Sequence, residues 1–222
     1  MGSASALGGV VFTGSDAFGR AARVEFAQSG SNLVVTLKNT SVSDALVPTD
    51  ILTAVFWSFS GSAPSLSRVS AVLGAGSFVV NDPQPAGGVV GGEFAFASGF
   101  APVSGGTFGL SSVGLDLFGP PDRFPGPDLE PPTSPDGLQY GITSAADNIA
   151  TGNGGLLGTP LIVDTVVLTL SGLPVGFDLG SIQNVSFQYG TGLSEPRIPG
   201  VPGPGAAGLL GLGGVLALRR RR

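Results

Sequence analysis

Residues 161–170 read Leu-Ile-Val-Asp-Thr-Val-Val-Leu-Thr-Leu and carry the longest strand pattern in the chain. Valine, isoleucine and threonine are branched at Cβ, which favours extended backbone over helix. Residues 32–38 (Asn-Leu-Val-Val-Thr-Leu-Lys) repeat this composition and end at a turn signal, Asn39. Residues 51–59 (Ile-Leu-Thr-Ala-Val-Phe-Trp-Ser-Phe) are too continuously apolar for an edge strand, so we expect a central one. These stretches predict that the fold is built on β-sheet.

Shorter strand patterns complete the chain, and no stretch ahead of the C-terminal tail shows a helical period. Further strands are expected at residues 23–26, 67–73, 77–80, 93–96 and 185–189, the last of these being the final strand. Many short strands without intervening helices predict an all-β fold, an antiparallel β-sandwich of jelly-roll-like type. We expect this body to span residues 7–192. Residues 118–136 are too rich in proline for a strand ladder and predict a long surface loop.

Composition favours a folded body with an acidic surface. The chain has 38 glycines and 18 prolines, but only 11% of its residues are charged and 42% are hydrophobic, which argues against disorder. Four of its ten basic residues are the terminal arginines, so the rest carries six basic against 15 acidic residues, a balance of −9. Such a surface repels phosphate backbones, and we expect no nucleic-acid partner. Cysteine is absent, so stability must come from packing rather than disulfides.

The C-terminal 30 residues have a composition of their own. Residues 193–204 form a Pro/Gly-rich linker, and residues 205–222 join an uncharged apolar run to four terminal arginines: Arg219, Arg220, Arg221 and Arg222. Arginine clusters remain on the cytoplasmic side of a membrane. The 14-residue run would span about 21 Å as a helix, short of a hydrocarbon core of about 30 Å. We therefore expect a hydrophobic C-terminal helix that is held only transiently in the inner membrane.

This three-part tail resembles the PEP-CTERM sorting signal of Gram-negative bacteria. The motif position reads Val201, Pro202, Gly203 and Pro204, with glycine where the family usually has glutamate. The resemblance implies export to the cell surface or extracellular matrix and processing by an exosortase, a membrane-embedded protease. Body stretches such as residues 33–40 and 137–144 are similar to XDD-type exosortase-dependent surface proteins. That family brings no catalytic residues, so the resemblance implies a structural or adhesive role.

The N-terminus is expected to contain the end of an export signal. Ala4-Ser5-Ala6 is the small-residue triplet that precedes signal-peptidase cleavage, although the preceding residues lack a basic region and a long apolar region. One interpretation is a longer leader that starts upstream, with the mature chain beginning near Leu7. The alternative is a cloning remnant, since Met-Gly-Ser is common in such tags.

Catalytic chemistry has few residues available. Histidine and cysteine are both absent, which excludes Ser-His-Asp and Cys-His catalysis and the usual zinc sites. The Gly-x-Gly-x-x-Gly match at residues 203–208 follows prolines rather than a strand, so it does not predict nucleotide binding. A hydrolase would need two converging carboxylates, and we expect the protein not to be an enzyme.

The sequence is compatible with two kinds of binding site, one for calcium and one for polysaccharide. Calcium prefers carboxylate and carbonyl oxygens, and the acidic, proline-rich loop offers Asp122, Asp128 and Asp136. The alternative is a solvated acidic loop with no cofactor. As a second possible function, a carbohydrate-binding module would contact extracellular polysaccharide through exposed aromatic side chains. Trp57, Tyr140 and Tyr189 are the candidates for that role, unless they belong to the core.

Overall fold

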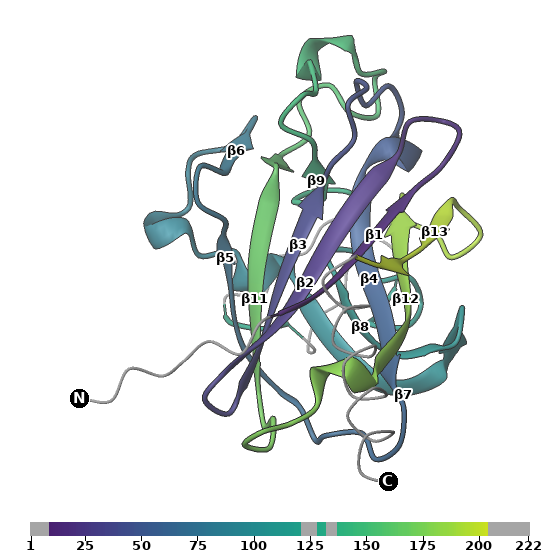
Figure 1. Cartoon of the computed structure of the whole chain (residues 1–222). Helices are drawn as coiled ribbons and strands as arrows, with labels where there is room; N and C mark the ends of the chain where they lie inside the picture. The colour runs from purple at the N-terminus through teal and green to yellow at the C-terminus, as the bar shows by residue number, and fades with distance from the viewer. Residues whose placement is uncertain (1–8, 121–127, 132–136, 204–222) are drawn as a thin grey trace, which may run out of the picture.

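The computed structural model describes residues 9–120, 128–131 and 137–203 and contains two facing β-sheets (Figure 1). The fold is all-β, with 46% strand and 8% helix, and the sheets are mainly antiparallel, consistent with the expected β-sandwich. Helical turns in the described residues are short 3₁₀ segments: Pro48–Asp50, Ala86–Gly88, Gly91–Glu93, Ile149–Thr151 and Leu179–Ser181.

Sheet A has the strand order β14-β1-β2-β3-β11-β5. Its members are β14 Val201–Pro202, β1 Val10–Ser15, β2 Ala21–Ser29, β3 Asn32–Asn39, β11 Thr165–Ser171 and β5 Ser67–Leu73. In β2 and β3 every second side chain is buried, as expected for strands with one face on the core. Gly30, at the turn between them, adopts φ +61°, which the tight hairpin requires.

Sheet B has the order β13-β12-β4-β9-β10-β6, and the hairpin β7–β8 joins it at β4. Its members are β13 Arg197–Pro199, β12 Ile182–Tyr189, β4 Leu52–Phe59, β9 Ile142–Thr143, β10 Leu161–Val163, β6 Phe78–Val80, β7 Ala95–Val103 and β8 Gly106–Ser111. The expected central strand is confirmed, because β4 pairs with β12 on one side and with β8 and β9 on the other.

Every residue of β4 is buried because both faces of this strand are covered. Val55, Trp57 and Phe59 face the main core between the sheets. Ala54 and Phe56 face a second apolar cluster under the β7–β8 hairpin, which includes Phe118. The unbroken apolar run of residues 51–59 therefore reflects burial on two sides rather than a helix.

The run at residues 161–170 is divided between the two sheets, which corrects its prediction as one strand. β10 belongs to sheet B and β11 to sheet A, and the chain changes sheet at Asp164, where φ is +86°. Aspartate tolerates this left-handed region better than most residues. Lys38 Nζ lies 2.8 Å from Asp164 Oδ1, so the only lysine of the chain fixes this corner.

Two further expectations are corrected by strand pairing. Residues 185–189 are not the last strand, because β13 pairs with β12 and β14 pairs with β1. Residues 118–136 are not entirely a surface loop: Leu129 is buried in the main core, and its N–H donates to the carbonyl of Phe94 at 2.8 Å. Here sequence composition misled, since a proline-rich segment can still contribute an isolated apolar anchor.

Candidate functional site

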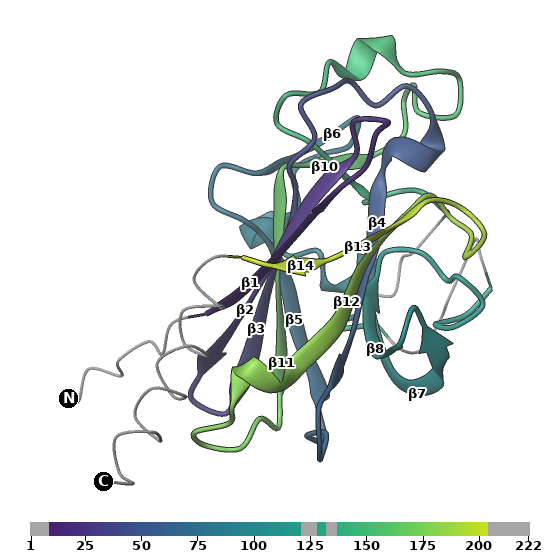
Figure 2. The same cartoon turned by 45° about the vertical axis from the view of Figure 1, so that its right-hand side comes forward.

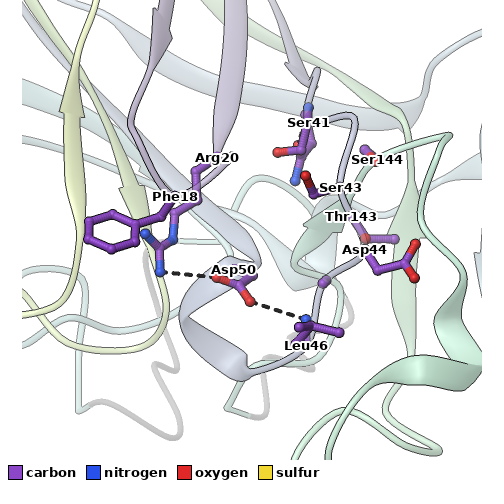
Figure 3. A pocket seen from close by; sticks show the side chains of 12 residues that line it. Phe18, Arg20, Ser41, Ser43, Asp44, Leu46, Asp50, Thr143 and Ser144 are labelled. Atoms are coloured by element: carbon purple, nitrogen blue, oxygen red, sulfur yellow. Dashed lines mark hydrogen bonds and ion pairs between the residues drawn. The ribbon is translucent and has the colours of Figure 1, made fainter.

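A polar hollow lies at the end of the β1–β2 hairpin, where three chain segments meet (Figure 3). The cavity has a volume of about 130 Å³. Its wall combines residues 18–20 of the hairpin, residues 39–46 after β3, and Thr143 and Ser144 at the end of β9. Eight polar side chains line it: Arg20, Asn39, Ser41, Ser43, Asp44, Asp50, Thr143 and Ser144.

Arg20 is the charged centre of this hollow. Its guanidinium lies 3.0 Å from a carboxylate oxygen of Asp16 and 3.0 Å from one of Asp50, and its Nε donates to the carbonyl of Thr49 at 2.8 Å. Burial alone raises the pKa of Asp16, but hydrogen bonds from the Arg20 side chain and from the amides of Phe18 and Arg20 outweigh it and hold that pKa below its ordinary value of 3.8. The cluster of one guanidinium and two carboxylates therefore carries a net charge of about −1 at neutral pH.

The other carboxylates around the hollow join two loops together. Asp44 accepts hydrogen bonds from the amide of Asn148 at 3.0 Å and from the hydroxyl of Thr151 at 3.1 Å. Asp147 accepts from the amide of Ala45 at 2.9 Å. Residues 43–50 and 143–153 are distant in sequence, so these bonds fix the shape of the hollow from both sides. Short acidic side chains satisfy backbone donors that the loops leave unpaired.

The side chains around the hollow act as hydrogen-bond donors and acceptors. Asp50 accepts from the amides of Leu46 and Val47 besides pairing with Arg20 (Figure 3). Its carboxylate and that of Asp44 therefore have internal partners. Two of the lining serines do as well: Ser41 Oγ accepts from the amide of Ala21 at 3.0 Å, and Ser144 Oγ accepts from the amide of Ala146 at 3.3 Å. Within the described residues no group of three or more Asp, Glu, His or Cys side chains is arranged to hold a metal ion.

The residues expected to bind calcium are not brought together in the described part of the chain. Asp122 and Asp136 lie outside the described residues. Asp128 is buried, pairs through its backbone with Ala95, and its carbonyl accepts a hydrogen bond from Arg68 at 3.1 Å. Calcium binding at this loop stays a prediction that rests on the sequence.

The three aromatic candidates for a sugar-binding surface belong to the interior, which agrees with the alternative that they form part of the core. Trp57 and Tyr189 are 0% exposed, and Tyr140 donates a hydrogen bond to Asp82 at 2.6 Å. Burial raises the pKa of both tyrosines. Trp57 packs against Phe26 with ring centroids 5.4 Å apart. These side chains stabilise the sandwich and offer no platform to a ligand.

Phe18 is a different case and was not singled out by sequence pattern. It lies at the tip of the β1–β2 hairpin, is 82% exposed, and has the Arg20 guanidinium 5.7 Å from its ring centroid. Isolated exposed aromatics are common. What makes Phe18 a candidate functional residue is its position at the rim of a polar hollow, which only the folded structure reveals.

The residues expected to form a sorting motif begin within the sandwich. Val201 and Pro202 form β14, which pairs with β1, and the N–H of Gly203 donates to the carbonyl of Val11 at 2.8 Å. A Cβ on Gly203 would lie 3.5 Å or more from its neighbours, an ordinary contact distance, so the position accepts a Cβ atom. Pro204 and the four terminal arginines lie outside the described residues. In the part of the chain that is described, no helix is both long and apolar enough to cross a bilayer.

Sequence patterns missed the Arg20 cluster and the pairing of residues 197–203. The first joins Asp16, Arg20 and Asp50 across a loop of unpredictable path, although the Ser/Asp-rich composition of residues 39–50 is a weak signal. The pairing of residues 197–203 was hidden by their proline content.

In comparisons with known proteins, no family model, no curated protein and no solved structure matches this chain.

Proposed function

We propose that this chain is an exported, non-catalytic β-sandwich protein of a Gram-negative cell surface or extracellular matrix. A C-terminal sorting signal, processed by an exosortase-type membrane protease, would deliver it, and its role would be structural or adhesive. The observation that carries the proposal is the order of the C-terminal residues: a proline-containing motif at 201–204, an uncharged apolar run, and four arginines. The proposal also includes jelly-roll-like connectivity and a short helical tail.

Two features of the body support this proposal. The final described strand, Val201–Pro202, contains the first two residues of the proposed motif, so the paired body and the proposed signal are continuous. The carboxylates around the polar hollow bind backbone amides and Arg20, which favours a scaffold rather than an active site.

Replacing the terminal arginines tests the proposed signal. The variant Arg219→Ser, Arg220→Ser, Arg221→Ser and Arg222→Ser is expected to lose membrane retention and processing in a host with an exosortase, because uncharged serines no longer hold the chain end in the cytoplasm. The matched variant with four lysines keeps the charge and is expected to behave like the natural chain. Intact mass of the extracellular protein measures processing. Recovery of mature protein that still contains residues 209–218 would refute the proposal.

A polysaccharide-binding role is the second candidate, favoured by the exposed Phe18 beside serine and asparagine side chains. Sugars commonly bind through an aromatic face and nearby hydrogen-bonding groups. Affinity electrophoresis in gels with a soluble neutral glucan is expected to retard the natural chain. Phe18→Ala is expected to remove the retardation, while Phe78→Ala, at another exposed phenylalanine, is not. Migration unchanged by the glucan would eliminate this candidate for that polymer.

A further inference from the structure

Residues 197–203, here called the C-terminal strap, join the edge of one sheet to the edge of the other. β13 pairs with β12 in sheet B, and after a single residue, Gly200, β14 pairs with β1 in sheet A (Figure 2). Ile198 is 3% exposed and belongs to the main core. The N–H of Gly200 donates to the carbonyl of Val185 at 2.8 Å. The strap is therefore an integral edge of the sandwich.

Proline fits into β14 because of the alternation of an antiparallel ladder. The bond from Gly203 N–H to the Val11 carbonyl identifies these two as a hydrogen-bonded pair. Hydrogen-bonded and non-hydrogen-bonded pairs alternate, so Pro202 opposite Phe12 needs no N–H, and Val201 opposite Thr13 is again a bonded pair. The motif sequence is thus compatible with a sheet edge.

We propose that the folded sandwich shelters residues 200–203 from proteases, and that removal of residues 201–203 requires β14 to separate from β1. Proteins that accept an extended peptide commonly form hydrogen bonds with its backbone N–H and C=O groups. In the folded protein, β1 already pairs with the backbone of Val201. β14 has only two residues, so its release is a local opening and does not require the sandwich to unfold. The assignment of the cellular protease rests on the proposed function, but the sheltering does not.

Two variants change the pairing of β14 in opposite directions. Thr13 and Val201 are directly opposed and both exposed, so Thr13→Cys with Val201→Cys offers a surface disulfide, in a chain that has no other cysteine. The Cα separation of such pairs, about 5.5 Å, suits a disulfide. Thr13→Pro removes the N–H that points toward Val201, while alternate residues of β1 maintain the ladder to β2.

Limited digestion of the full chain in detergent with a non-specific protease, followed by intact mass, tests sheltering directly. Every variant is expected to lose tail residues beyond 203, which shows that the protease is active. The loss of residues 201–203 is expected to be about tenfold faster in Thr13→Pro than in the natural chain, because a hydrogen bond is lost. It is expected to be slowest in the oxidised cysteine pair and to return to the natural rate on reduction.

Equal rates in the oxidised and reduced cysteine pair would overturn the proposal. Thermal melting shows whether Thr13→Pro has folded; if it has not, the oxidised and reduced comparison decides alone. The same variants in a host with an exosortase separate the two proposals. Sheltering in vitro without any processing in cells would refute the proposed function and leave sheltering intact. Equal processing of the locked and unlocked chains in cells would refute the requirement for β14 release there.

Discussion

At the scale of single residues, the Asp16–Arg20 pair makes the free energy of unfolding depend on pH in the acidic range. The pKa of Asp16 is lower in the folded protein than its ordinary value of 3.8, so its ionised form is favoured by folding. This contribution is present above about pH 4 and is lost as the pH falls through the lower folded pKa. Asp16→Asn is expected to cost about 1 kcal/mol or less at pH 7, since the pair is near the surface.

The measurement is urea unfolding of both proteins between about pH 2 and pH 7. The difference in unfolding free energy is expected to shrink as the pH falls, because the protonated aspartate also lacks its charge. Asp178→Asn, at a carboxylate that caps a 3₁₀ turn without an ion pair among the described residues, serves as the control. A difference that stays constant down to the lowest pH would contradict the role of Asp16.

Asp164 determines whether the chain can change sheet between β10 and β11. Its φ of +86° is costly for a residue branched at Cβ, by about 1–3 kcal/mol. Asp164→Val is expected to lose this amount together with the Lys38 ion pair. Asp164→Asn also loses the charge but tolerates the backbone, and we expect a cost of about 1 kcal/mol. Equal free energies of unfolding for the two variants would show that the backbone conformation is unimportant.

At the scale of elements, the strap is expected to contribute to stability through a single side chain. Ile198→Ala would leave a cavity between the sheets and cost about 2–4 kcal/mol. Val201→Ala, in the same strap but 62% exposed, should change stability by less than about 0.5 kcal/mol. Chemical denaturation of both variants makes the comparison. Similar losses would mean that the strap acts through its backbone alone.

Most strands of the sandwich could be predicted because alternation of apolar residues is a local property. The run at residues 32–38 became β3, and the continuous run at residues 51–59 became the doubly covered β4. The division at Asp164 could not be predicted, since both halves have the same composition and only the backbone angle separates them. The strap could not be predicted from the sequence, because proline disfavours strands unless its nitrogen faces away from the partner strand. The identity of that partner strand is also not encoded in the local sequence.

The candidate sites were less accessible to sequence reasoning. Tryptophan and tyrosine occur both in sugar-binding surfaces and in hydrophobic cores, so residue type alone does not assign Trp57 and Tyr189. Their complete burial places them in the core. The polar hollow depends on loops that approach from three parts of the chain, with Asp44 and Asp147 as the connections. Contacts between segments that are distant in sequence cannot be predicted from local patterns, and only the polar composition of the loops indicates such a site.

At the scale of the whole molecule, the strap moves the end of the cooperative body from residue 192 toward residue 203. Sheet A and sheet B share one core, and residues 197–202 connect their edges on the side of β1 and β12. A chain that ends at Gly203 keeps every described contact. A chain that ends at Gly192 loses β13, β14 and the buried Ile198, so its core opens to water along one edge.

Thermal melting of these two chains is expected to separate the alternatives for the body. The chain ending at Gly203 should melt near the temperature of the full chain, because it keeps every contact among the described residues. The chain ending at Gly192 should melt lower by about 5–15 °C, since a loss of about 2–4 kcal/mol shifts the melting temperature by about 2–4 °C per kcal/mol in a protein of this size. Equal melting temperatures would return residues 193–203 to the role of a linker, and would also mean that a protease could remove them without weakening the β-sandwich body.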